Sequence, residues 1–300
     1  MTRQQMLTGV GIILIIAAVA WRFALGTQLD QRFEDGWSWQ MNTLGLNSLA
    51  DEDTGAFPEG TTLADDPDTL NTRTISATAN DVPEGQVNIT DYYEVHNAST
   101  NALDWDFTIN ATVDAATGQY LEGSYEGDYY LIPRNAEQTT YVVSNSTYQS
   151  LPMAFQREEE IAGLKTYLYA FYGDLPNTQS YSDMELEEGQ EVVCFDFEME
   201  YWVEPTTGEI VRYRDWCEGD YVVDADGETL YGLQRWGSTS QQDDIVQRVD
   251  AVKTLLNNYR LNSLYIPMVL FVLGVLALGL AFSPGLLKDD TNNTKGKPIA

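Results

Sequence analysis

Two long apolar segments lie at the two ends of the chain and enclose a region of mixed character. Leu7–Leu25 reads LTGVGIILIIAAVAWRFAL, and Leu264–Phe282 reads LYIPMVLFVLGVLALGLAF. Each segment is about as long as the roughly 20 residues that cross a bilayer as a helix. The pattern predicts transmembrane helices at 7–25 and 264–283, on either side of a domain at 26–263.

The charges beside these segments predict an orientation. Arg3 precedes the first segment, and three lysines follow the second: Lys288, Lys295 and Lys297. Cytoplasmic flanks of membrane helices are enriched in such cations. We therefore expect a two-pass protein of the cell membrane with cytoplasmic ends at 1–6 and 284–300 and an extracellular central domain.

The first segment also has an alternative interpretation as a cleaved signal peptide. A short basic start, an apolar run of about 14 residues and a small-residue site are typical of such peptides, and Ala18-Val19-Ala20 resembles the cleavage site. Its full length favours a retained anchor. The central domain is extracellular under either interpretation.

The central domain has the alternation of β-strands. Phe195–Tyr201 reads FDFEMEY, with one apolar and one acidic face. The turn sequence Glu204-Pro205-Thr206-Thr207-Gly208 follows, and a return strand is expected over Ile210–Trp216. Strands separated by turns are predicted from about 74 to 233, after an acidic loop at 51–72.

One part of the chain resembles another. Trp105–Leu121 aligns without gaps on Phe195–Val211, and Val223–Glu228 has a looser turn of the same kind. Reused turn chemistry explains this, but two similar halves in one sheet also do, and we favour the second explanation. The predicted fold is mainly β: an elongated curved antiparallel sheet or half-open β-barrel made of two similar halves, flanked by N- and C-terminal transmembrane helices.

Helical spacing returns near the end of the central domain. Its apolar positions are Ile245, Val249, Val252, Leu256 and Tyr259. Asp243 and Asp244 suit a helix start because acidic side chains complement the helix dipole there. An amphipathic helix is expected at about 243–260, running directly into the second membrane segment.

The chain is strongly acidic. With 16 Lys and Arg against 46 Asp and Glu, the net charge is −30. Nucleic acid is excluded as a partner because its phosphates require a basic face. An acidic, lysine-poor surface is typical of proteins in high salt, which predicts a halophilic archaeal source.

The two cysteines are predicted to form a disulfide. Cys194 and Cys217 flank the hairpin, and a disulfide is the natural state outside the cell. Charge pairing of Glu200 with Arg212 and of Glu198 with Arg214 puts the cysteines one residue out of line. A bulge near Asp215 would correct this offset.

Four sequons fall in the central domain and predict N-glycosylation. The candidate residues are Asn88, Asn97, Asn110 and Asn145. A fifth, at Asn292, lies on the predicted cytoplasmic tail, where it would be unused.

The sequence shows no catalytic or metal-binding constellation. His96 is the only histidine, and no serine elbow or phosphate loop is present. Two cysteines and one histidine cannot complete a zinc site. Asp224–Glu228 lacks the full ligand set of a calcium loop. We expect a protein that is not an enzyme and has no cofactor or metal, with tryptophans that fill a core or line a cavity.

The layout resembles the porin PorA family. The residues that carry the resemblance are Tyr141-Val142-Val143, Leu151-Pro152-Met153-Ala154-Phe155, Gly163-Leu164-Lys165-Thr166-Tyr167 and the hairpin Tyr201–Val211, YWVEPTTGEIV. Similar hairpins occur in lipid-carrying lipoproteins of the LolA and LppX type. The resemblance implies a half-open β-barrel whose concave side holds a lipid or other apolar ligand.

Two functions are therefore expected. The first is a membrane-anchored, non-catalytic module that binds a lipid or apolar ligand, with membrane lipids and other envelope or membrane proteins as partners. The alternative is a structural component of the cell surface or of a membrane complex, without a small ligand.

Overall fold

The computed structural model describes residues 2–29, 31–60, 62–63, 67–145 and 149–283. The chain divides into a helical unit (Met1–Asp30 with Leu255–Ala300) and a β domain (Gln31–Thr254). The predicted tail at 284–300, with Asn292, lies outside the described residues.

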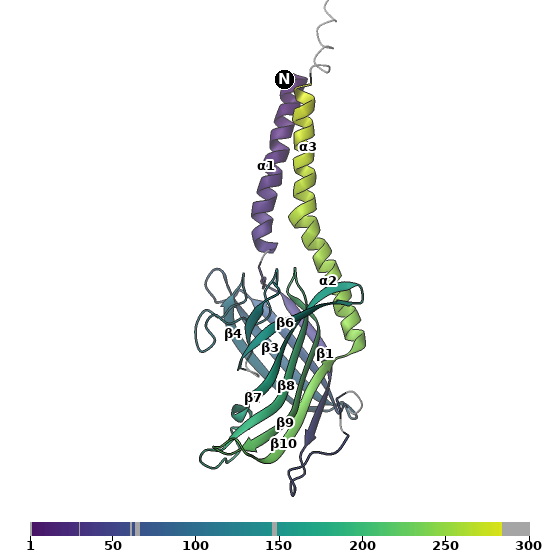
Figure 1. Ribbon diagram of the computed structural model, residues 1–300. Helices are drawn as coiled ribbons and strands as arrows, with labels where there is room; N and C mark the ends of the chain where they lie inside the picture. The colour runs from purple at the N-terminus through teal and green to yellow at the C-terminus, as the bar shows by residue number, and fades with distance from the viewer. Residues whose placement is uncertain (1, 30, 61, 64–66, 146–148, 284–300) are drawn as a thin grey trace, which may run out of the picture. The chain divides into compact units, whose positions relative to one another are not determined.

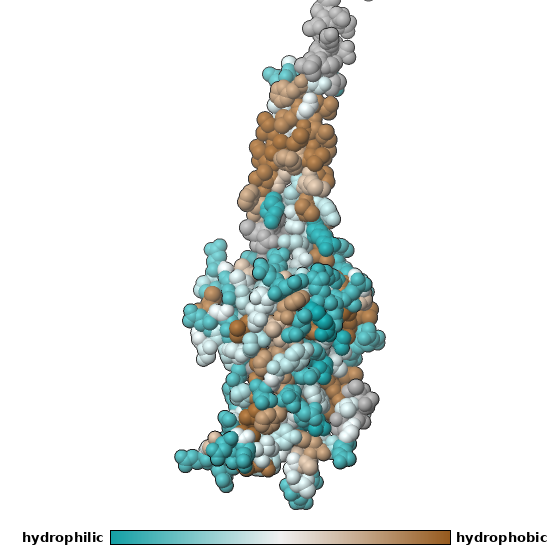
Figure 2. All heavy atoms as spheres, viewed as in Figure 1, coloured by the Kyte–Doolittle hydropathy of each residue, from teal (hydrophilic) through white to brown (hydrophobic). Residues whose placement is uncertain are grey.

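In the helical unit, α1 (Arg3–Leu29) lies against α3 (Ile266–Ala281) (Figure 1). Glycines permit close approach: a Cβ built on Gly11 would lie 2.7 Å from Leu278 Cγ. The Trp21 indole donates to the Asn262 carbonyl at 3.2 Å. Both helices are apolar enough to cross a membrane, and hydrophobic side chains cover their surface in Figure 2.

The expected amphipathic helix is present as α2 (Gln242–Arg260). It continues without a break through a π-helical turn, η2 (Leu261–Tyr265), into α3. Arg248 of α2 donates to Glu209 at 2.9 Å, and Lys253 donates to the Ala162 carbonyl at 2.6 Å. These bonds fix the first part of α2 to the β domain.

Within the described residues, ten strands form one antiparallel sheet, in the order β4-β3-β2-β1-β10-β9-β8-β7-β6-β5. The strands are β1 (Ser38–Leu49), β2 (Thr69–Thr78), β3 (Gln86–Asn97), β4 (Leu103–Asp114), β5 (Thr140–Asn145), β6 (Gln149–Ile161), β7 (Leu164–Pro176), β8 (Glu191–Glu204), β9 (Glu209–Val223) and β10 (Thr229–Ser240). The sheet consists of two meanders, β1–β4 and β5–β10, joined by the pairing of β1 with β10. It curls into the predicted half-open barrel (Figure 1).

The connection between β4 and β5 narrows the opening of the barrel at one end. Val113 of β4 pairs with Tyr120, Gln119 pairs with Tyr129, and Tyr129 pairs with Val143 of β5. This short chain of bridges joins the two edge strands. Toward Leu103 of β4, no such bridge joins the edge strands within the described residues, and we call this end the open end of the barrel.

The hydrophobic core fills the narrowed end. Tyr130, Leu131 and Ile132 follow the bridges and are fully buried there. They belong to the same buried cluster as Met41 of β1 and Tyr201 of β8. This loop fills the concave face only at one end; toward the other end, the described residues that lie on the concave face include Asn177 and Ser180, which line a cavity.

The sequence similarity between Trp105–Leu121 and Phe195–Val211 is local. In the first segment the Asp114 carboxylate accepts from the Thr117 amide at 2.7 Å. In the second, Glu204 accepts from the Thr207 amide at 2.8 Å. A glycine with positive φ follows each threonine. However, β4 is an edge strand and β8 is an interior strand, so the shared feature is the turn.

The disulfide between Cys194 and Cys217 is present, with the Cα atoms 5.9 Å apart. The predicted register around it is wrong by two residues. Glu200 pairs with Arg214, and Glu198 pairs with Trp216. Arg214 forms ion pairs with both glutamates, so either register satisfies the charges, and the turn geometry decides between them.

The irregularities of β8 and β9 also lie elsewhere than predicted. The register shifts between Trp202 and Val203, beside the turn, and Asp215 is regularly paired with Met199. No bulge therefore separates β8 from β9 at Asp215. Near the disulfide, Asp196 has a φ of 48°, and its amide donates to the Asp174 carboxylate at 3.1 Å. In the β8–β9 ladder Cys194 is paired with Asp220, three residues from its disulfide partner Cys217.

Candidate functional site

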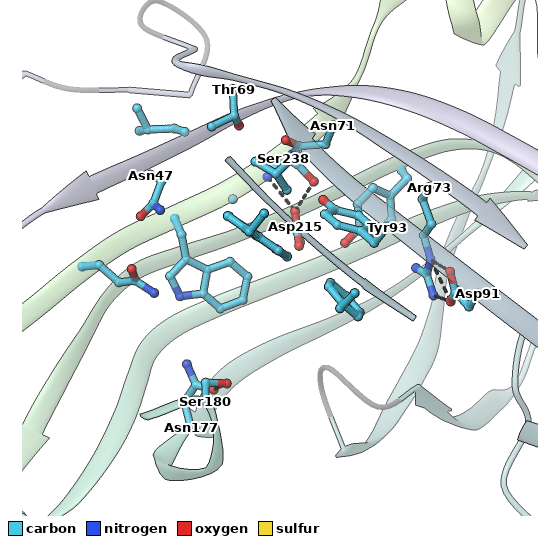
Figure 3. A pocket seen from close by; sticks show the side chains of 18 of the residues that line it. Asn47, Thr69, Asn71, Arg73, Asp91, Tyr93, Asn177, Ser180, Asp215 and Ser238 are labelled. Atoms are coloured by element: carbon cyan, nitrogen blue, oxygen red, sulfur yellow. Dashed lines mark hydrogen bonds and ion pairs between the residues drawn. The ribbon is translucent and has the colours of Figure 1, made fainter. Parts of the chain in front are cut away.

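A cavity of about 400 Å³ lies on the concave side of the sheet, toward the open end of the barrel. Figure 3 shows side chains that line it. This volume is within the range of small-molecule sites. Its lining residues are Leu46, Asn47, Thr69, Asn71, Arg73, Asp91, Tyr93, Val95, Trp105, Phe107, Ile109, Asn177, Ser180, Tyr213, Asp215, Gln234, Trp236, Gly237 and Ser238. They come from β1–β4, β9, β10 and the short helix η1 (Thr178–Tyr181), together with Asn177, the residue before η1.

One wall of the cavity is a platform of three aromatic rings. Tyr93 of β3 stacks on Trp105 and Phe107 of β4, with ring centroids 5.7 and 5.3 Å apart. Trp105 and Phe107 are stacked at 5.6 Å with an angle of 15°. β4 is an edge strand of the sheet, so among the described residues no further strand pairs beyond it, and Trp105 is 46% exposed.

The wall that adjoins the Tyr93 ring is polar and buried. Asp215 of β9 accepts from the Ser238 amide at 2.6 Å and from the Ser238 hydroxyl at 2.7 Å. Asn71 of β2 is 6% exposed, and its Oδ1 atom has no hydrogen-bond partner. Figure 3 shows Asn71, Asp215, Ser238 and Tyr93 gathered on one side of the cavity. Burial, with a contribution from the Asp215 charge, raises the pKa of Tyr93, which therefore stays a neutral phenol.

A buried ion pair closes one end of the cavity. The Arg73 Nε atom donates to both oxygens of Asp91, at 3.1 and 3.0 Å. The Tyr130 hydroxyl donates to the same carboxylate at 2.6 Å. Burial lowers the pKa of Arg73, but the charge and hydrogen bonds of Asp91 outweigh this and raise it well above its usual value. The pair therefore contributes no net charge to the cavity.

A second buried carboxylate lies beside the disulfide. Asp220 accepts from the Asn177 side-chain Nδ2 atom at 2.9 Å, from the Tyr181 hydroxyl at 2.7 Å and from the Trp236 indole at 2.7 Å. Burial raises the pKa of Asp220, although these hydrogen bonds oppose the shift. The network fixes η1 and Trp236 at the cavity.

Asp220 and the two cysteine sulfurs lie within 4.8 Å of one another. Both sulfurs are joined in the disulfide, so they are not thiolate ligands in this state. The cluster is therefore a structural element of the domain.

The predicted glycosylation residues lie on or beside the strands that form the first meander and β5. Asn88 accepts from the Thr112 hydroxyl at 2.8 Å, and the exposed Asn110 accepts from the Thr90 hydroxyl at 3.3 Å. Asn97 accepts from the Thr100 amide at 3.0 Å in the β3–β4 turn. Asn145 ends β5, and its side chain lies outside the described residues. Asn88, Asn97 and Asn110 do not line the cavity, and glycosylation of the four residues stays a prediction.

The other candidate residues have structural contacts. His96 Nδ1 lies 3.3 Å from the Asn101 carbonyl, away from the cavity lining. Asp224 accepts from the amides of Asp226 and Glu228 at 3.0 and 2.9 Å, as expected of a plain turn.

The tryptophans divide between the two roles considered for them. Trp105 and Trp236 line the cavity, whereas Trp39 is buried in the core. The polar wall of Asn71 and Asp215 was not predicted. Both residues alternate with outward side chains in their strands, but this pattern does not distinguish a cavity wall from a core.

The family model described as Porin PorA matches residues 5–283, nearly the whole chain. A search of curated proteins found none that matches the chain.

Proposed function

The chain belongs to the Porin PorA family, and on that premise we propose that it is a membrane-anchored protein whose β domain binds a lipid or another apolar ligand. The aromatic platform of the cavity is the observation that carries this proposal. Soluble domains rarely leave large rings exposed on a concave face unless a partner covers them. A bound acyl chain would gain about 0.8 kcal/mol for each methylene removed from water.

The proposed role is binding without catalysis. Acid–base and nucleophilic chemistry usually rely on a histidine or an activated nucleophile within the site. The lone histidine, His96, is not among the cavity residues. The Asp91 carboxylate accepts hydrogen bonds from Arg73 and from the Tyr130 hydroxyl, so its role in the proposal is structural.

We also propose that the β domain is extracellular and that both termini are cytoplasmic. The cations beside the two apolar segments support this orientation, and the disulfide is consistent with an oxidising compartment. Membrane lipids are the nearest source of an apolar ligand for a domain anchored in this way.

Native mass spectrometry of the full chain tests the proposal. The protein is released from its native membrane in high salt and its mass is measured before and after organic extraction. A discrete additional mass that extraction removes is expected, and its fragmentation would identify the ligand. A bare protein mass, after allowance for the disulfide and glycans, would instead support a structural role at the cell surface.

A further inference from the structure

Strand β4 forms one edge of the sheet and pairs with β3 on one side. On its other side, within the described residues, only its C-terminal end is joined to a further segment, where Val113 pairs with Tyr120. The β3–β4 ladder is regular from Trp105 to Val113, because its one register shift lies nearer Leu103. β4 contains neither proline nor lysine, which commonly protect an edge strand from further pairing. Its free side is therefore able to pair with another strand.

Alternate backbone groups of β4 point toward this free side. The Ala115 amide, just after β4, donates to the Gly85 carbonyl beside β3 at 2.8 Å. The Asp114 amide donates in the other direction, to the Gln119 carbonyl at 2.9 Å. Successive residues of a strand direct their N–H and C=O groups to opposite sides, so every second residue before Asp114 directs them away from β3. In the regular part of the ladder these residues include Asp106, Thr108 and Asn110. Nothing in the described part of the chain bonds to the backbone groups of these three on the free side.

The two faces of β4 differ in chemistry. Trp105, Phe107 and Ile109 line the concave cavity, whereas the exposed side chains of Asp106 and Asn110 alternate with them and lie on the convex face. A strand that pairs with β4 continues both faces. It therefore needs apolar side chains at every second position on the concave side.

The convex face beside this edge is acidic. Glu94 of β3 lies directly opposite Asp106, and the Tyr92 hydroxyl lies 3.0 and 3.1 Å from their carboxylate oxygens. A phenol has only one hydrogen to donate, so it cannot satisfy both at once. Within the described residues, Glu94, Asp106 and the exposed Asp104 form no ion pair. Like charges directly opposite each other destabilise a strand pair, and a cation on an adjoining strand relieves this repulsion.

The charge also distinguishes between partners. The chain has a net charge of −30, and a second copy paired along β4 would bring two acidic edges together. Such like-charge contact disfavours self-association. A basic strand has the complementary charge.

We propose that β4 is a docking edge for an extended segment of a partner protein in which apolar residues alternate with lysine or arginine. The segment adds a strand to the sheet, antiparallel to residues 105–111, by backbone hydrogen bonds. Its cations lie beside Asp106 on the convex face, and its apolar side chains extend the platform of Trp105 and Phe107.

Binding of a fluorescent peptide to the full chain in phosphatidylcholine nanodiscs tests this proposal. The probe is a capped heptapeptide in which four valines alternate with three lysines, and its binding is measured by anisotropy, with empty nanodiscs as the blank. In the proposed register the lysine N–H groups face β4 and the valine N–H groups face away. N-methylation of the three lysines should weaken binding at least about tenfold, because three hydrogen bonds are lost. N-methylation of three valines, with the same charge and composition, should leave binding unchanged.

Thr108→Pro tests the same edge from the protein side. It removes an N–H that points away from β3, where an edge strand tolerates proline, and should weaken binding of the unmethylated peptide about tenfold. The matched control is Thr108→Val, which keeps the N–H and should bind as the wild type does. A thermal unfolding curve verifies folding. If Thr108→Pro does not fold, the pair of methylated peptides alone decides.

The role of charge has its own pair of variants. Asp104→Asn with Asp106→Asn should weaken binding about fivefold, because it removes the acids beside the edge. Asp226→Asn with Glu228→Gln removes two exposed acids from the β9–β10 turn and should leave binding unchanged. Equal losses in the two double variants would contradict recognition at β4.

Three results would overturn the proposal. The first is no binding of the unmethylated peptide. The second is equal binding of the two methylated peptides, which would show attraction by the overall charge without strand pairing. The third is a dimer of the full chain that Thr108→Pro abolishes and Thr108→Val does not, which would assign the edge to a second copy.

Discussion

Arg32 donates to Glu209 across 3.3 Å, inside the β domain, with side chains that are 1% and 5% exposed. The same guanidinium donates to the carbonyls of Ile132 and Gly208, both at 3.0 Å. The second oxygen of Glu209 accepts from Arg248 of α2. One carboxylate thus holds the first residues of the domain and its last helix to the hairpin that carries the family resemblance.

Glu209→Gln should lower the free energy of unfolding by about 3 kcal/mol or more, because it leaves two buried guanidinium groups without their counter-ion. Chemical denaturation of the full chain in nanodiscs, followed by circular dichroism, measures the change. The control is Glu34→Gln, whose half-exposed carboxylate lies 3.9 Å from Arg134; its effect should stay within about 0.5 kcal/mol. Equal effects of the two substitutions would contradict the role of Glu209.

Gly208 and Gly227 form a matched pair of turn glycines, with φ of 73° and 80°. Alanine at Gly227 meets no atom within 4 Å, so it should cost about 1 kcal/mol for the backbone conformation alone. Alanine at Gly208 places a Cβ 2.8 Å from the Pro133 carbonyl oxygen and should cost at least about twice as much. Denaturation midpoints of the two variants compare the costs, and a smaller loss at Gly208 would refute the close packing.

Replacing Cys194 and Cys217 together by alanine should lower the free energy of unfolding by about 3 kcal/mol, because the unfolded chain is no longer constrained. A reductant should have a comparable effect on the wild type and none on the double variant. Denaturation curves with and without reductant measure both. Wild-type stability that is indifferent to reductant, with the thiols shown to be free, would contradict the prediction.

The raised pKa of Asp220 predicts how stability depends on pH. Between the ordinary aspartate pKa of about 3.9 and the raised native value, the native state binds more protons than the unfolded state. The contribution of Asp220 to stability therefore falls as pH rises through this window. It is measured as the difference in unfolding free energy between wild type and Asp220→Asn across pH. An Asp220 difference that rises with pH would have the wrong sign and contradict the prediction.

Long periodic segments were predictable from the sequence. The two apolar helices, the Phe195–Tyr201 strand with its Thr-Gly turn and the helix at about 243–260 are all present, because each pattern extends over several turns or residue pairs. β1 (Ser38–Leu49) was missed. Its buried Trp39 and Met41 alternate with polar residues. The alternation is interrupted where the two strands pair, by Gly45 in β1 and by Gly237 in β10.

The cavity was not predictable in detail, because it depends on which strands are neighbours. Trp105 and Asp215 are 110 positions apart in sequence numbering and share a cavity only because β1 pairs with β10. The pattern of charges along β8 and β9 also could not determine how the two strands pair, since Arg214 forms ion pairs with both Glu198 and Glu200. Sheet order and turn geometry, which are tertiary properties, decide both features.

The central claim is that the concave cavity holds an apolar ligand, and native mass spectrometry of two tryptophan variants tests it most directly. Ile109→Trp fills the cavity from β4. Leu103→Trp adds the same side chain on the same strand at a position that is 52% exposed and outside the lining. The account predicts that the extractable mass is lost in Ile109→Trp and kept in Leu103→Trp. Equal ligand occupancy in both variants and the wild type would place the ligand elsewhere and contradict the account.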